Sequence, residues 1–253
     1  MSRGFFHFPL CLLAFGEEYK ERLQYIVCYC LYEEAKRTNP DFPKSVKKIG
    51  LDDAATFLHV TTGSYDSTIC RWRKADDFLS RWEERYGKDA RVRIGTSLLW
   101  EAHNTTSVSY REFSILCAID SIIGHRRSIP KRITEPSIRV RAAGFKSWNV
   151  ARSELSCDAL GKATLLTVNQ VRHTLEGLHQ RRFFARARVG AKSVKYMLGV
   201  SDDELRLLLR ECETYRQRFR AERAKKDAEL MAAIRSTKRQ PISINKDRNT
   251  APH

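Results

Sequence analysis

Four polar side chains near the start of an expected helix, residues 168–180, have the chemistry needed to read the edges of DNA bases. An arginine can form two hydrogen bonds with guanine, and an asparagine or glutamine can form two with adenine. A helix that enters a major groove makes these contacts through its first residues. The four candidates are Asn169, Gln170, Arg172 and His173. The alternative interpretation of these residues is a solvent-exposed helix face with no ligand.

A basic hairpin is expected directly after this helix, with strands at about 183–189 and 193–198 around Gly190. Arg186 and Arg188 are two positions apart, so they project from the same face of one strand. Arginines on one face of a hairpin suit phosphates or a minor groove. A basic strand can also serve only to prevent edge pairing. The other basic residues of this region that we assign to DNA binding are Arg181, Arg182, Lys192 and Lys195.

Further basic residues lie on or after an earlier expected helix, residues 135–143. We expect them to contact phosphates, which fix the position of a protein on DNA without reading its sequence. The candidates are Arg139, Arg141 and Lys146.

The distribution of charge supports a polyanionic partner. The chain has 253 residues and a formal net charge of +16. Residues 123–199 hold 16 basic and 4 acidic side chains, a net charge of +12, whereas residues 1–122 hold 17 of each. A basic block of this density favours nucleic acid as the partner, although a solvated basic surface is the simpler alternative.

The second half of the chain has clear signals for the elements that would position these residues. Polar start signals predict helices over 109–123, 134–143, 167–180 and from 201 onward, because a Ser or Thr side chain can cap each first turn. A further short helical stretch is expected at 148–155. The last helix carries an apolar stripe formed by Leu205, Leu209, Cys212, Tyr215 and Phe219.

The first half repeats this order less clearly. Apolar spacing predicts helices over 17–37, 52–60 and 67–86. Residues 91–94 and 97–100 are expected to form a small hairpin around Gly95-Thr96. Phe5 to Phe15 is apolar but short, and we interpret it as a buried segment.

Three helices followed by a two-stranded wing is the plan of the winged helix-turn-helix superfamily, which residues 109–199 resemble. The resemblance lies in the capped helix Thr167 to Leu178, the run Arg181-Arg182-Phe183-Phe184 and the hairpin from Arg186 to Tyr196. Residues 52–82 resemble a helix-turn-helix more loosely. A tandem pair of winged helices is similar to plasmid-type replication initiators, and this comparison is one of fold alone.

One departure from the plan leaves two candidates for the recognition helix. The stretch from Phe145 to Leu166 is long for the turn between the second and third helices. Either it is an insertion, or residues 147–155 form the recognition helix and residues 168–180 pack behind it.

The sequence carries no motif of a familiar enzyme or cofactor site. It has no glycine-rich phosphate loop with Lys-Ser/Thr, no zinc-protease motif and no Cys-x-x-Cys pair. We therefore expect no catalysis, no cofactor and no metal. Cys28 and Cys30 are expected to be buried thiols, and the seven scattered cysteines favour a reducing cytosol. No apolar run reaches the ~18 residues needed for a membrane span, so we expect a cytoplasmic protein of the bacterial cytosol or nucleoid.

The sequence thus predicts a mainly α protein with small β-hairpin wings, arranged as tandem winged helix-turn-helix modules plus a long C-terminal helix. The expected segments are an N-terminal module at 1–106, a basic DNA-binding module at 107–200, the helix at 201–236 and a basic tail at 237–253. The predicted function is sequence-specific binding of double-stranded DNA, in replication initiation or transcription control. The alternative is an interaction subunit that binds protein or RNA within a larger assembly. The C-terminal helix could pair with a second copy or fold back on its own module, and folding back is the default expectation.

Overall fold

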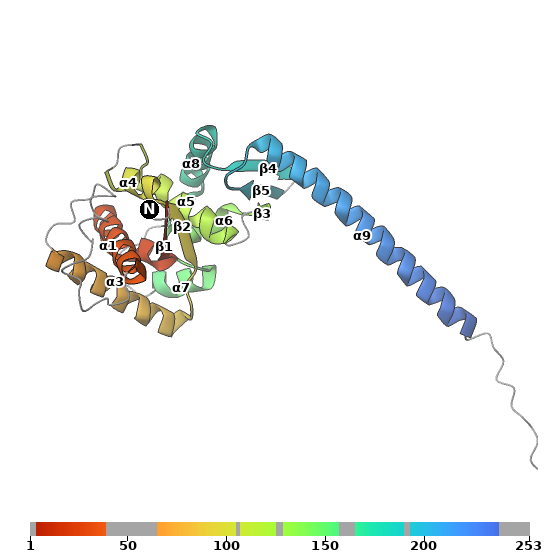
Figure 1. Ribbon diagram of the computed structural model, residues 1–253, viewed down its shortest axis with the longest axis horizontal. Helices are drawn as coiled ribbons and strands as arrows, with labels where there is room; N and C mark the ends of the chain where they lie inside the picture. Colours follow the sequence, from red (N-terminus) through yellow and green to blue (C-terminus); the bar gives the residue numbers. More distant parts are fainter. Residues whose placement is uncertain are drawn as a thin grey trace, which may run out of the picture. The chain divides into compact units, whose positions relative to one another are not determined.

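The computed structural model describes residues 4–38, 65–104, 107–124, 129–156, 165–189 and 193–237 (Figure 1). The chain divides into two units, Met1–Leu205 and Arg206–His253. The described part is mainly helical, with two small antiparallel sheets. The expected helix at 52–60 and residues 238–253 of the expected tail lie outside the described residues.

The apolar N-terminal segment is buried, as predicted. It forms strand β1 (Phe5–Pro9) and the 3-10 helix η1 (Leu10–Ala14), in which every residue of η1 is buried. Strand β1 pairs with strand β2 (Arg91–Gly95), with Phe8 opposite Val92 and Phe6 opposite Ile94. These four apolar side chains are buried and join one hydrophobic cluster.

The hairpin predicted at 91–100 is wrong. Its first half is strand β2, but the strand's partner is β1 from the start of the chain. Its second half begins helix α4 (Thr96–Asn104), in which Leu99 and Ala102 are both buried. Buried residues three apart lie on one helix face, whereas a strand would bury alternate residues. The alternation at 91–94 indicated a strand correctly, but a single strand does not reveal its partner.

Two long helices complete this first region. Helix α1 (Tyr19–Thr38) and helix α3 (Tyr65–Tyr86) pack against each other and against η1. Cys28 and Cys30 are buried in α1, as predicted. Burial raises the pKa of the Cys28 thiol to about 11 and that of Cys30 well above its usual value, so both remain protonated at neutral pH.

The second region has the predicted order of helices. It contains α5 (Tyr110–Ile123), α6 (Glu135–Ala142), α7 (Trp148–Ser156) and α8 (Val168–Gln180). The predicted start signals are confirmed, because Ser109, Thr134 and Thr167 each cap their helix through the side chain. Two bonds between Ser201 and Glu204 begin the last helix in the same way.

A three-stranded sheet closes this region. Strands β4 (Ala185–Val189) and β5 (Ser193–Met197) form the predicted hairpin. The short strand β3 (Lys131–Arg132), between α5 and α6, pairs with the other edge of β5, so the order is β3-β5-β4. Phe184 and Tyr196 join α5, α6 and α8 in a second hydrophobic cluster.

Helix α5 connects the two clusters. Phe113 and Cys117 belong to the first, and Ile115, Leu116 and Ile119 belong to the second. The helix contacts β2, α4 and η1 as well as α6 and α8 (Figure 1). The two regions therefore share one helix at their junction.

Helix α9 (Asp202–Thr237) begins in the first unit and forms the described part of the second. Leu205 is fully buried, whereas every residue from Arg210 to Arg235 is exposed. Of the predicted stripe, Tyr215 is 71% exposed and Phe219 is 57% exposed. Among the described helices, none has both the length and the apolar character that a membrane span requires.

Candidate nucleic-acid interface

Helix α8 has the inner and outer faces that its sequence predicts. Val171 and Leu175 are buried in the second cluster. Asn169, Arg172 and His173 are exposed. The polar residues proposed to read bases therefore face solvent, because the apolar residues of the same helix hold it against the core.

Two of the four predicted base-reading residues already bind other parts of the protein. Gln170 completes the helix cap, since its side-chain Oε1 accepts a hydrogen bond from the Thr167 N–H at 2.8 Å. Arg172 donates from Nε to Glu135 Oε1 at 2.8 Å, although its side chain remains 63% exposed. A DNA contact by Arg172 would therefore compete with Glu135 or use its remaining donors.

Arg181 stabilises the junction between α8 and α5. Its guanidinium donates to Glu112 at 2.7 Å and to the Ser107 carbonyl at 2.8 Å, and it lies over the Phe183 ring. Glu112 is also the acidic member of the α5 cap. These contacts give Arg181 a structural role that its place beside the hairpin did not reveal.

The hairpin shows the expected alternation. Ala185 and Ala187 are buried, Arg186 is half-buried and Arg188 is exposed. Arg186 pairs with Glu176 of α8, and this bond holds the pKa of the Glu176 carboxyl below its usual value. Lys192 lies outside the described residues.

Lys195 lies on β5 opposite Arg132 of β3. Residues opposite each other on neighbouring strands point to the same side of the sheet, and like charges in this arrangement repel. These two side chains therefore favour a nearby anion.

The residues expected to bind phosphates around α6 are largely engaged within the protein. Arg139 donates from Nε to the Leu166 carbonyl at 2.6 Å and so holds the segment that leads into α8. The ammonium of Lys146 donates to three carbonyls at the end of α3, those of Tyr86, Gly87 and Lys88. Arg141 is half-buried, its Nη1 has no hydrogen-bond partner, and burial lowers its pKa.

Helix α7, the second candidate for the recognition helix, is held against α3. Its Glu154 is buried, accepts a hydrogen bond from the Tyr86 hydroxyl and pairs with Arg85 at 3.0 Å. Val150 and Ala151 are buried in the first cluster. Arg152 is the one basic residue of α7, and it is exposed.

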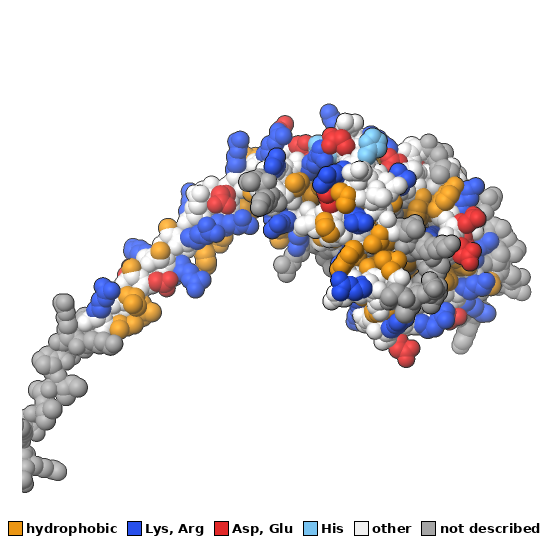
Figure 2. All heavy atoms as spheres, turned by 180° about the vertical axis from the view of Figure 1, so that it is seen from behind, with side chains coloured by type: hydrophobic (Ala, Val, Ile, Leu, Met, Phe, Trp, Pro, Cys, Tyr) orange, Lys and Arg blue, Asp and Glu red, His pale blue; other side chains and the backbone are white. Residues whose placement is uncertain are grey.

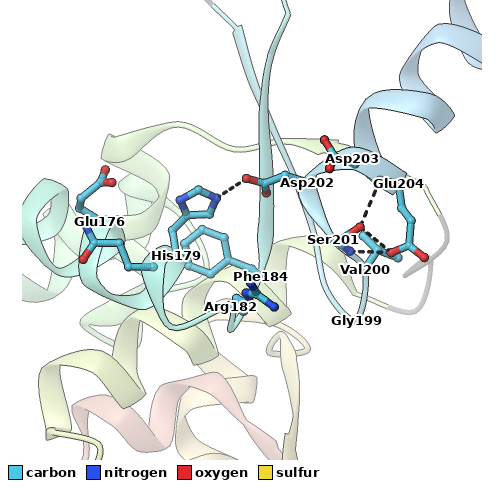
Figure 3. Close-up of a pocket in the computed structure, with 11 residues that line it drawn as sticks. Glu176, His179, Arg182, Phe184, Gly199, Val200, Ser201, Asp202, Asp203 and Glu204 are labelled. Carbon is cyan, nitrogen blue, oxygen red and sulfur yellow. Dashed lines mark hydrogen bonds and ion pairs between the residues drawn. The ribbon is translucent and has the colours of Figure 1, made fainter.

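Figure 3 shows a pocket of about 720 Å³ between the end of α8 and the start of α9. His179 points toward Asp202, and their side chains are 2.7 Å apart. The other carboxylate oxygen of Asp202 accepts the backbone N–H of Arg186 at 2.9 Å. Asp202 thus links α8, β4 and α9, and the sequence signal was only its position in the first turn of an expected helix.

Arg182, another predicted site residue, borders this pocket and has an unusual backbone. Its φ is 61°, the left-handed region that favours glycine. Its N–H donates to His179 O at 2.9 Å, and the next N–H, of Phe183, donates to Leu178 O at 3.1 Å. This pair of bonds is the Schellman ending of a helix, which most often has glycine at this position.

In the described part of the chain, no group of His, Cys, Asp and Glu side chains could hold a metal ion. Comparisons of the chain with protein-family models, curated proteins and solved structures found no match. The resemblance to winged helices therefore stays a prediction.

Proposed function

We propose that residues 107–200 form a winged-helix module that binds double-stranded DNA. Helix α8 would enter the major groove, and the β4–β5 hairpin would contact the backbone. One observation carries the proposal: α5, α6, α8 and the hairpin share one hydrophobic cluster, while Asn169, Arg172 and His173 face outward. A shared core holds a reading helix and a wing at a fixed spacing.

We assign the recognition role to α8 rather than α7. The acidic side chain of α7, Glu154, is buried against α3, and Arg152 is the only basic residue this helix contributes. Helix α8 combines amide, guanidinium and imidazole groups near its start, where contacts with base edges are made. Helix α7 then corresponds to an insertion between the second and third helices of the plan.

The internal ion pairs leave the long-range electrostatic attraction in place. The net charge of +12 in residues 123–199 already counts Glu135 and Glu176. Figure 2 shows basic and acidic side chains interspersed on the displayed face. We therefore expect non-specific attraction from the whole module, and base discrimination mainly from Asn169 and His173, which have no partner among the described residues.

A second candidate function is favoured by the same ion pairs. Arg172, Arg181 and Arg186 each pair with a glutamate, which reduces their ability to bind phosphate. Within the alternative, an interaction subunit that binds protein or RNA, this arrangement favours protein, because RNA carries the same phosphates as DNA. For a DNA binder, the biological role would be replication initiation or transcription control, and sequencing of DNA fragments recovered with the protein from cells distinguishes these roles.

The test is a binding titration of the full chain with duplexes of random sequence, single-stranded RNA and single-stranded DNA. We expect duplex binding that weakens by about 10³–10⁵ between 50 and 200 mM salt, as for ~6–10 phosphate contacts. Retention of RNA with indifference to duplex DNA would support the interaction subunit. No binding of duplex DNA at low salt would refute the proposal.

Variants test the assignment of roles. Arg172→Ala should relax preference at one base position, with a loss there of about 1–3 kcal/mol. Lys192→Ala should weaken binding to duplexes of every sequence by the same factor. Arg152→Ala, on the exposed face of α7, is the matched control. Equal losses on every sequence for Arg172→Ala and Lys192→Ala would refute α8 as the recognition helix.

We also propose that α9 pairs with a second copy of the chain. Its apolar residues Tyr215, Phe219 and Leu230 are all more than half exposed. Mutual burial of such residues stabilises helix pairs. Sedimentation should show a dimer that Tyr215→Ser with Phe219→Ser converts to a monomer, and a monomer for the unaltered chain would exclude the pairing.

A further inference from the structure

A second pocket lies between the end of α5, strand β3, helix α6 and the start of α7. Its volume is about 580 Å³, which falls in the range of small-molecule sites. Among the described residues that line it are three basic side chains, Arg132, Arg141 and Lys146, and no carboxylate. The charge of the pocket wall therefore favours an anion.

The three basic side chains differ in how many of their hydrogen-bond donors already have a partner within the protein. Lys146 has its three donors on backbone carbonyls, so it contributes charge rather than a contact. Arg141 is half-buried, and its Nη1 lacks a hydrogen-bond partner. Arg132 is exposed and lies across the strand pair from Lys195. The buried carboxylate of Asp89 attracts Arg141 and Lys146 but is not among the described residues that line the pocket. Arg132 has no acidic partner among the described residues.

The other residues that line the pocket are mainly apolar or small and polar. Trp148, at the start of α7, is 47% exposed and lines the pocket together with Ile122, Pro136 and Val140. Its exposed fraction leaves part of the indole ring available to a ligand in the pocket. Planar bases stack on such rings, and the stacking tolerates any base.

We propose that this pocket binds a nucleoside 5′-phosphate, with the base on Trp148 and the phosphate near Arg132 and Arg141. Arginine forms paired hydrogen bonds with phosphate oxygens, and apolar neighbours exclude water from the base. The nucleotide could be free or the unpaired end of a nucleic-acid strand. The pocket uses none of the exposed α8 residues, so this inference stands apart from duplex binding.

The experiment is calorimetric titration of the full chain with adenosine 5′-monophosphate, adenosine, inorganic phosphate and a 5′-phosphorylated single-stranded oligonucleotide. We expect the monophosphate to bind at least tenfold more tightly than adenosine or phosphate alone. Binding of the oligonucleotide without the mononucleotide would identify a strand end as the natural ligand. Binding of neither overturns the proposal.

Two variants locate the binding. Trp148→Ala, at an exposed position, should weaken binding by about tenfold or more because stacking is lost. Arg132→Ala should weaken the binding of adenosine 5′-monophosphate and leave the affinity for adenosine unchanged. Arg152→Ala, an exposed arginine of α7 outside the pocket, should bind as the unaltered chain does. Unchanged affinity in both Trp148→Ala and Arg132→Ala overturns the proposal, and circular dichroism confirms that each variant is folded.

Discussion

Replacement of Arg182 by glycine should stabilise the protein, although the change removes a charged side chain. Arg182 has a φ of 61° at the Schellman ending of α8. A residue with a Cβ loses about 1–2 kcal/mol in this conformation, whereas glycine does not. Glycine also gives the unfolded chain more freedom, which offsets about 0.4–1 kcal/mol. The expected net gain is about 1 kcal/mol.

Arg182→Ala is the control that isolates the backbone. Alanine removes the guanidinium but keeps the Cβ, and Arg182 forms no side-chain hydrogen bond or ion pair with the described residues. The stability of the Arg182→Ala variant should therefore match that of the unaltered chain. For a domain of about 200 residues, the gain expected for glycine corresponds to a rise in Tm of about 2–4 °C.

Urea unfolding and thermal melts of the three proteins measure the difference directly. If the glycine and alanine variants unfold at the same urea concentration, the reasoning from backbone strain is wrong. The same pair also tests the binding assignment. A phosphate contact by Arg182 predicts equal weakening of duplex binding in both variants, and unchanged binding in both would remove Arg182 from the interface.

Three further predictions test packing, capping and titration. A Cβ at Gly144 would lie 2.7 Å from the Ala14 N, and φ there is 91°, so Gly144→Ala should lower the free energy of unfolding by about 2–4 kcal/mol. Gly199→Ala, with φ 75° and open space, is the control for the close contact and should lose only about 1–2 kcal/mol in the same urea assay. Lys146→Met should cost about 1–2 kcal/mol, because three carbonyls lose their donor, and leave base preference unchanged in the duplex titration. Stability should fall as pH rises from about 9 to 11, because burial holds the Cys28 pKa at about 11 in the folded chain against 9.0 in the unfolded one, so the unfolded state releases its proton first. Thermal melts across this pH range should show a smaller loss of stability in Cys28→Ala than in the unaltered chain.

The helices of the second region could be predicted because their signals are local. The caps at Ser109 and Thr167 each join residues three apart. The hairpin of β4 and β5 is also local, since Arg188 faces Val194, only six positions later in the chain. A sequence shows such features directly, because the two interacting residues are only a few positions apart.

The errors concern partners that are distant in the sequence. Strand β2 pairs with a strand more than eighty residues earlier, so the alternation at 91–94 could not distinguish that strand from a local hairpin. Arg172 and Arg181 bind glutamates 37 and 69 positions away. From the sequence alone, a basic residue near a predicted recognition helix is expected to be available for DNA. Only the fold shows that an acidic side chain already pairs with it.

These pairs alter what the basic region can do. Removing Glu135 would free the Arg172 guanidinium while raising the net charge of the module by one. If Arg172 contributes to duplex binding, Glu135→Gln should therefore tighten binding on all sequences through charge and increase selectivity through the released arginine. In the double variant Glu135→Gln with Arg172→Ala, the first change raises the net charge by one and the second lowers it by one. The net charge then equals that of the unaltered chain and the arginine is absent, so the double variant should show neither gain. If selectivity is the same in Glu135→Gln as in the unaltered chain, Arg172 serves to hold α6 against α8, and base reading must lie with Asn169 and His173.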